Sequence, residues 1–310
     1  KGYLAVSPPA GTSRMTIREP DYDKLATNKT TRERLKSYCT NMGAKHKTGW
    51  AYPCQFQRYT QLSWPPSVGS SMSIITRTRV DTLEMTHGCT QAEPHCKFAH
   101  KGSMTYFSAG VEYSTMFLDH SIRNSNGEIE RNLANMHGSL LDCDGNQLKS
   151  FRPRKPGTTN LQYILERVVT VNDLLRAAGG TGHGCSFLSL DDRSDSMNDG
   201  SQSLRYSGTT LIVYIDYDNT KTFDQNDVEF TMRVRRLPNT EHKVEYTTPG
   251  QKLSLTKITE LTVHGILVVV VQTGKLGAFD LKEMLVQLTA ALTLLAMSGA
   301  IVNLLATTVV

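Results

Sequence analysis

Residues 284–310 read MLVQLTAALTLLAMSGAIVNLLATTVV, a run of 27 residues without a charged side chain. A helix rises about 1.5 Å per residue, so this run would be roughly 40 Å long. The hydrocarbon core of a bilayer is about 30 Å thick, and a helix buried in a soluble core is seldom this long and apolar on every face. We therefore predict that residues 284–310 form a transmembrane helix.

The rest of the chain, residues 1–283, has the composition of a water-soluble body. The whole chain has 310 residues, and its 34 basic and 29 acidic side chains are well mixed, which does not indicate a nucleic-acid-binding protein. The first residues lack the charged-then-apolar pattern of a secretory signal. A body placed before a membrane helix normally needs such a signal, so we expect a cleaved signal or another membrane segment before Lys1.

Cysteines and a glycosylation sequence indicate an extracellular or lumenal body. The six cysteines are an even number, which fits three disulfides in several possible pairings. Asn28 opens the only Asn-x-Ser/Thr acceptor sequence. Disulfides form and persist in oxidising compartments. The cysteines are Cys39, Cys54, Cys89, Cys96, Cys143 and Cys185.

The body is predicted to be mainly β with a few helices. Residues 228–235 alternate between apolar and polar side chains, which is the period of a half-buried strand. Residues 261–272 contain four consecutive valines, which favours a strand buried on both faces. Further strands are predicted at 71–80, 111–118 and 209–217, and helices at 25–38 and 160–178.

A short joint, TGKLGAFD at 273–280, separates the valine-rich strand from the membrane helix. A strand coupled this closely to a membrane helix can transmit motion to it, whereas a passive tether is more often a longer flexible linker. A simple anchor with a short stalk is the alternative interpretation.

No cofactor, metal centre or enzyme is predicted. The chain has no Gly-x-Ser-x-Gly or comparable catalytic frame. The best metal candidate is a cluster of histidines and cysteines, but the Cys89–Cys96 spacing is not a tight zinc spacing, and a disulfide with nearby histidines fits better. A zinc-dependent enzyme would need metal at His87 and His95. The cluster is His87, Cys89, His95, Cys96 and His100.

Several segments, in order, resemble those of one family, the ionotropic purinergic receptors, which are ATP-gated trimeric cation channels. The last two are similar to the family's final strand with its joint and to its pore-lining helix. The segments are KGY at 1–3, WPPSVGSSMSIITRTRVDTLEMTHGC at 64–89, TMFLDHSIRN at 115–124, VNDLLRAAG at 171–179, FTMRVRRLP at 230–238, HGILVVVVQTGKLGAFD at 264–280 and LTLLAMSGAIVN at 292–303.

The resemblance implies a dolphin-like, β-rich extracellular or lumenal domain over 1–283, followed by the transmembrane helix 284–310. It also implies a homotrimer or heterotrimer around a central pore, in a plasma or vacuolar membrane, and a first membrane helix before Lys1. Two departures from the family are an extra segment at 20–63 and a reduced head at 89–105. With these departures, the expected disulfides are Cys39–Cys54, Cys89–Cys96 and Cys143–Cys185.

By the same resemblance, ATP would lie between subunits, with its phosphates held by cations. Arg18 occupies a lysine position of the family's first strand, and Arg14 lies on the same strand face as a substitute cation. Thr115 stands at the position of a threonine that contacts the base, and Lys243 replaces an arginine. These four are the expected ligand-binding residues.

Other cation positions are lost. Thr16 and Thr262 stand where the family has lysines, and a third lysine becomes Asp119 or His120 according to the alignment. A hydrogen bond to a charged group is worth about 1.5–3 kcal/mol, so losing two would cost about 3–6 kcal/mol, or roughly 10² to 10⁴ in affinity. The alternative is a subunit that binds no nucleotide.

Two functional hypotheses follow from the resemblance. In the first, the chain is a subunit of a ligand-gated cation channel with a degenerate ATP site, Leu292 lies near the pore constriction, and Asn303 replaces an acidic residue of relatives. In the second, it is a non-gated structural or adhesive membrane subunit of a larger assembly, with an extracellular protein partner at 20–63.

Overall fold

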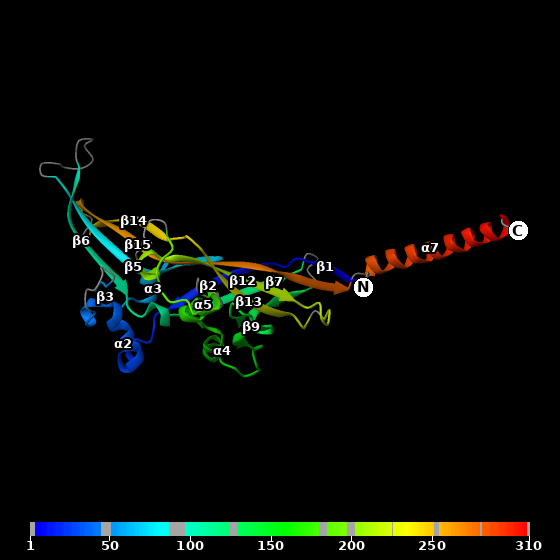
Figure 1. The fold of residues 1–310 in the computed structure, drawn as a ribbon, viewed down its shortest axis with the longest axis horizontal. Helices are drawn as coiled ribbons and strands as arrows, with labels where there is room; N and C mark the ends of the chain where they lie inside the picture. The colour runs from blue at the N-terminus through cyan, green and yellow to red at the C-terminus, as the bar shows by residue number, and fades with distance from the viewer. Residues whose placement is uncertain are drawn as a thin grey trace.

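The computed structural model describes residues 4–44, 51–86, 97–124, 129–179, 185–196, 202–224, 226–250, 254–279 and 281–308. The body is elongated, with its long strands running lengthwise, and helix α7 (Leu281–Thr308) projects from one end (Figure 1). Strand β1 (Leu4–Ser7) lies beside the start of α7 (Figure 1). The prediction of a mainly β body followed by one apolar C-terminal helix is confirmed.

The larger sheet is built around β15 (Ser254–Phe279). β15 pairs with β12 (Thr209–Asp218) in parallel on one side and with β5 (Ser71–Met85) in antiparallel on the other. The order continues through β13, β9 and β10 beyond β12, and through β6 and β3 beyond β5. The remaining strands are β3 (Cys54–Gln55), β4 (Ser63–Val68), β6 (Phe98–Ser108), β9 (His137–Leu141), β10 (Gln147–Phe151), β13 (Glu229–Leu237) and β14 (Lys243–Gly250).

A smaller sheet contains β2 (Ala10–Arg18), β7 (Thr115–Arg123), β8 (Glu130–Asn132) and β11 (Val169–Thr170). The main hydrophobic core joins the inward faces of the two sheets. Met15 and Leu118 from the small sheet lie in one cluster with Val213, Tyr217 and Val268 from the large one.

The prediction of a separate joint at 273–280 is wrong, because β15 continues without a break to Phe279. The backbone groups of this stretch pair with β1, whose Leu4 and Ser7 lie opposite Phe279 and Leu276. The valine-rich part is also less buried than predicted. Val268 and Val270 are buried, but Val269 and Val271 are half-buried, so one face alone lies in the core.

Helix α7 has the dimensions of a membrane span. Within it Met284–Thr308 is long and apolar enough to cross a bilayer, and none of it is buried against the body. The side chains from Leu285 to Thr308 are exposed, which a water-soluble helix of this composition would not tolerate. Among the described residues it is the single helix of this kind.

Three predicted elements have different boundaries. The predicted helix 25–38 is two helices, α1 (Tyr22–Thr27) and α2 (Lys29–Tyr38), because the Asn28 side chain caps α2. The predicted helix 160–178 is divided into α4 (Asn160–Arg167) and α5 (Val171–Ala178) by β11, and Thr170 caps α5. The predicted strand 111–118 opens as the 3-10 helix η2 (Val111–Tyr113). Further short helices are η1 (Thr40–Met42), α3 (Tyr59–Leu62), η3 (Leu133–Asn135) and α6 (Leu204–Ser207).

Two expected disulfides are present. Cys39 and Cys54 form a disulfide with their Cα atoms 5.2 Å apart, and Cys143 and Cys185 form one with their Cα atoms 5.4 Å apart. The first bond closes the segment 20–63 on itself. Cys89 and Cys96, expected to form the third bond, lie outside the described residues.

Asn28 is exposed, and its side-chain oxygen accepts hydrogen bonds from the backbone N–H groups of Thr30 and Thr31. Replacing Asn28 with alanine is expected to remove both the cap and the predicted glycan, and loss of the cap costs about 1 kcal/mol. Replacing Thr30 with alanine removes the acceptor sequence but keeps the cap. Gel mobility before and after glycosidase treatment, with denaturant unfolding of deglycosylated samples, separates the effects. Equal unfolding midpoints for the two variants would contradict the capping role.

Candidate ligand site

The end of β2 brings two of the predicted ligand residues together. Strand alternation turns Arg14, Thr16 and Arg18 outward, while Met15 and Ile17 are buried. Arg18 lies directly opposite Thr115 of β7. Opposed residues of antiparallel strands have Cα atoms about 4.5–5.5 Å apart, so Arg18 and Thr115 can contact one ligand.

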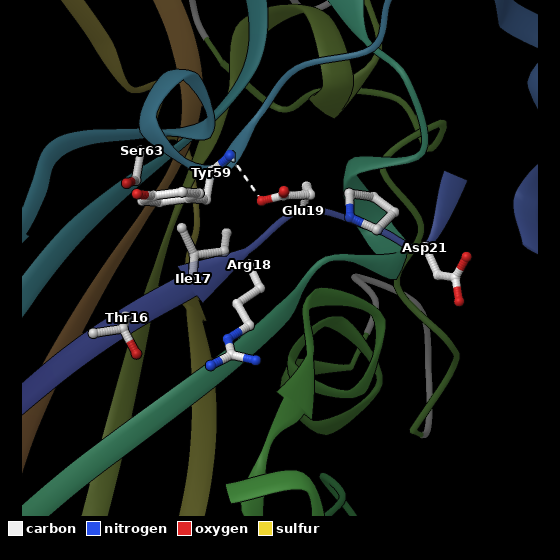
Figure 2. A pocket seen from close by; sticks show the side chains of 8 residues that line it. Thr16, Ile17, Arg18, Glu19, Asp21, Tyr59 and Ser63 are labelled. Atoms are coloured by element: carbon white, nitrogen blue, oxygen red, sulfur yellow. Dashed lines mark hydrogen bonds between the residues drawn. The ribbon is translucent and has the colours of Figure 1, made fainter. Parts of the chain in front are cut away.

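A groove of about 750 Å³ opens beside Arg18, and we call it groove 1 (Figure 2). Tyr59 reaches it from α3 in the segment 20–63, and the Tyr59 backbone N–H donates to the Glu19 carboxylate at 2.9 Å. The Tyr59 side chain is about half exposed and offers an aromatic surface. Sequence reasoning missed Tyr59. The lining residues are Thr16, Ile17, Arg18, Glu19, Pro20, Asp21, Tyr59 and Ser63.

Arg14 does not join Arg18 in this groove. It lies opposite Asp119 and lines a separate hollow with Asp119 and His120. Of the two residues that could replace the family's third lysine, Asp119 is exposed and His120 is buried. The His120 imidazole is hydrogen-bonded to the Tyr217 hydroxyl at 2.7 Å, and burial lowers its pKa to about 3. His120 therefore stays neutral at physiological pH.

Lys243 lies in a second groove of about 530 Å³, groove 2, which crosses β14, β15 and β5. Lys243 of β14 and Arg77 of β5 lie on either side of His264 of β15. The next row on the same face of the sheet is Glu245, Thr262 and Arg79. Lys243 and Arg18 thus lie in different grooves of one chain. The lining residues are Arg77, Arg79, Asp81, Tyr206, Glu241, Lys243, Glu245, Glu260, Thr262 and His264.

The charges of groove 2 are nearly balanced. Its lining has three cationic and four acidic side chains, and burial lowers the pKa of His264 to about 4, so that imidazole adds no charge at neutral pH. Lys243 Nζ lies 2.5 Å from Glu245, and a hydrogen bond from Lys243 lowers the pKa of Glu245. Arg79 Nε lies 2.8 Å from Asp81. An isolated groove 2 therefore attracts a polyanion only weakly.

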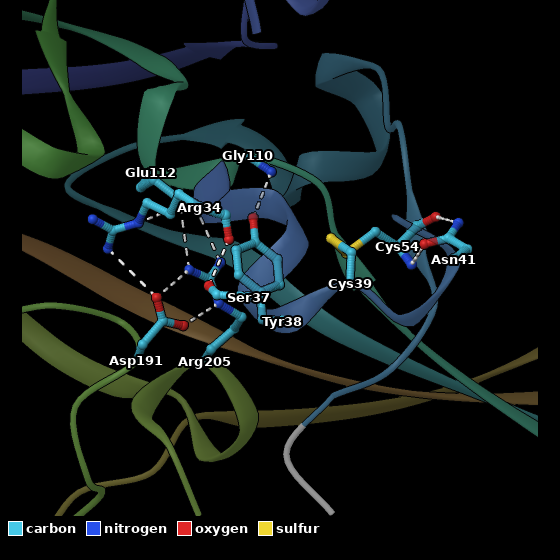
Figure 3. The surroundings of a disulfide bond; sticks show 10 residues. All are labelled: Arg34, Ser37, Tyr38, Cys39, Asn41, Cys54, Gly110, Glu112, Asp191 and Arg205. Atoms are coloured by element: carbon cyan, nitrogen blue, oxygen red, sulfur yellow. Dashed lines mark hydrogen bonds and ion pairs between the residues drawn. A yellow bond between two sulfur atoms is a disulfide. The ribbon is translucent and has the colours of Figure 1, made fainter. Parts of the chain in front are cut away.

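Ion pairs around two buried residues, Glu112 and Arg205, fasten the segment 20–63 to the body (Figure 3). Arg205 is buried, and its guanidinium donates to Glu112 at 3.1 and 3.3 Å and to Asp191 at 2.8 Å. Arg34 of α2 donates to the same Glu112 carboxylate at 3.1 Å. We call Arg34, Glu112, Asp191 and Arg205 the buried charge cluster.

The predicted histidine and cysteine cluster is largely outside the described residues, which include only His100. His100 lies on β6, and its Nε2 atom is hydrogen-bonded to the Asp81 carboxylate at 3.1 Å. Within the described ranges no group of three or more potential ligands could hold a metal ion.

The two predicted pore residues lie on α7, and both are exposed. Leu292 and Asn303 are eleven positions apart. At about 100° per residue, that spacing returns to within about 20° of the same direction. One face of α7 can therefore present both side chains to a common axis.

Comparison with known proteins points to one class. No family model matches the chain. Among solved structures it is similar to an invertebrate receptor from the Gulf Coast tick, crystallised with ATP and Zn²⁺, with 13% identity, a TM-score of 0.48 and coverage of 98% of this chain and 93% of that one. Among curated proteins it is 28% identical to P2X receptor E of Dictyostelium discoideum, over 99% of this chain and 74% of the relative. P2X receptor A of the same organism is also 28% identical, over 99% of this chain and 75% of the relative.

The chain is therefore receptor-like from end to end, and the class is that of membrane receptors, not of enzymes. The resemblance to the ionotropic purinergic receptors is confirmed: over 99% of its length the chain is similar to P2X receptors.

Proposed function

We propose that the chain is a subunit of a trimeric, ligand-gated cation channel that binds a nucleotide such as ATP between subunits. The observation that carries the proposal is the course of β15. This one strand forms the floor of groove 2 at Thr262 and His264 and continues to Phe279, immediately before α7. The intervening 15 residues span about 50 Å.

The separation of the two grooves supports a site shared between subunits. Arg18 and Thr115 belong to the small sheet, whereas Lys243 belongs to the large one. The linings of grooves 1 and 2 have no residue in common. A triphosphate that contacts Arg18 and Lys243 together would take Arg18 from one subunit and Lys243 from its neighbour.

Gating would use the stiffness of the paired strand. A ligand that draws two subunits together displaces groove 2, and β15 is hydrogen-bonded along its length to β5, β12 and β1. Displacement of the Phe279 end would tilt α7 and separate the pore-lining faces that carry Leu292. Asn303 brings no charge to the pore, so selectivity for cations would rest on other groups.

The proposal is tested by binding and current together. Replacing Arg18 or Lys243 with alanine is expected to weaken ATP binding by about 10- to 150-fold, because each change removes a charged hydrogen-bond donor worth about 1.5–3 kcal/mol. Calorimetric titration of the intact trimer measures the affinity, and recordings from reconstituted trimers measure the current.

Lys221 is a matched control, since it is exposed and lines neither groove. Its alanine variant should bind like the unaltered protein. Trimers that pass no current with any nucleotide would refute the gating proposal.

The non-gated structural or adhesive subunit is the second candidate, supported by the extra segment 20–63 and the lost cations. A protein partner that contacts this segment in a purified complex would favour it. A nucleotide-dependent current would count against it.

A further inference from the structure

The strand register of groove 2 places a cationic side chain, Arg79, beside Thr262, which stands at a lost lysine position. Thr262 stands in β15 between Glu245 of β14 and Arg79 of β5. Arg79 is therefore a direct cross-strand neighbour of Thr262, with Cα atoms about 4.5–5.5 Å apart. Its side chain is about half exposed and lines the same groove as Lys243.

Arg79 is better placed for a ligand than the other arginine of the groove. Arg77 is 6% exposed, and its guanidinium carbon lies 3.5 Å from the centre of the Tyr206 ring. That contact holds Arg77 in the wall of the groove. Arg79 instead lies at the surface, where its planar guanidinium can form two parallel hydrogen bonds to a phosphate.

The acidic partners of these cations oppose a bound anion without preventing binding. Both members of the Lys243–Glu245 pair are exposed, whereas in the Arg79–Asp81 pair only Arg79 is, because Asp81 is buried. Exposed ion pairs contribute little, at most about 1 kcal/mol or roughly fivefold in an equilibrium constant. A triphosphate that makes stronger, multiple contacts can therefore displace Glu245 from Lys243, and it can share Arg79 with Asp81, which Arg79 contacts through Nε.

We propose that Arg79 is a phosphate-binding residue of groove 2, supplying from β5 the positive charge that Thr262 lacks in β15, and that Glu245 weakens binding by competing for Lys243. The ligand class is a nucleoside triphosphate or another oligophosphate. The inference rests on the proposed ligand-gated function for the nucleotide, but the phosphate contact itself can be measured separately.

The test uses the intact trimer and two probes, ATP and inorganic tripolyphosphate. Arg79→Ala should weaken the binding of both by about 10- to 150-fold. Arg79→Lys should recover part of the loss, because lysine keeps the charge but not the two-pronged geometry. Glu245→Gln should strengthen binding by up to about fivefold, since Lys243 loses its competing partner.

Arg233→Ala is the matched control, because Arg233 is a comparably exposed arginine with an acidic partner, Asp216, 3.5 Å away and lies outside groove 2. It should leave both affinities unchanged. If Lys243→Ala weakens ATP binding and Arg79→Ala does not, the inference is wrong while the proposed function stands. If tripolyphosphate binds in an Arg79-dependent way and ATP evokes no current, the inference stands and the gating proposal fails. If neither ATP nor tripolyphosphate binds, both the inference and the proposed function are wrong.

Discussion

Replacing Glu112 with alanine is expected to destabilise the protein by about 3–5 kcal/mol, the usual cost of breaking a buried ion pair from one side. Glu112 and Arg205 are each about 1% exposed at their side chains, and Arg34 shares the same carboxylate. Without Glu112, the fully buried Arg205 keeps only Asp191 as an acidic partner within the buried charge cluster. Denaturant unfolding of the purified trimer measures the change.

The matched control is Glu33→Ala. Glu33 is paired with Lys36 on the same helix α2, but both side chains are about half exposed. Loss of such a pair costs at most about 0.5 kcal/mol. Similar unfolding midpoints for Glu112→Ala and Glu33→Ala would show that the buried charge cluster does not hold the segment 20–63 against the body.

Replacing Gly265 with alanine is expected to cost about 3 kcal/mol or more and to impair the ligand response. Gly265 follows His264 in β15 at a shift in register with β5, and a Cβ atom there would lie 1.9 Å from the carbonyl oxygen of Ile74. The obstacle is backbone, so the two strands would have to separate, and overpacking of this kind is costly. The separation would also disturb the rows of groove 2.

Gly102→Ala is the control for Gly265. Gly102 lies in β6, and a Cβ atom placed there meets nothing within 4 Å among the described residues. Thermal unfolding and ATP titration of both variants test the expectation. A Gly265→Ala protein with unchanged stability and affinity would show that β5 and β15 can move apart freely, which would also weaken the proposed transmission through β15.

Much of the fold could be predicted because its signals are local. The alternation at 228–235 and the valines at 268–271 mark strands by their spacing, and the uncharged run at 284–310 marks the membrane helix by its length. Boundaries failed where one polar side chain changed the local structure. Asn28 and Thr170 each cap a new helix inside a stretch that has a continuous helical pattern.

The ligand site was only half predictable. Arg18 and Thr115 were identified by position, and the register of β2 with β7 places them side by side. Arg79 was not identified, because nothing near it in the chain indicates a ligand. Its neighbours Thr262 and Glu245 lie more than 160 positions away, and only strand pairing brings them together.

By itself, the sequence determined that this protein has a β-rich body joined to an apolar C-terminal helix, because hydrophobic periodicity and the absence of charge act over short stretches of chain. The tertiary structure alone decided that β15 runs unbroken from groove 2 to α7, and that Arg18 and Lys243 lie in separate grooves. Those facts depend on which strands pair and in what register, and pairing is set by backbone hydrogen bonds and core packing between residues far apart in the chain.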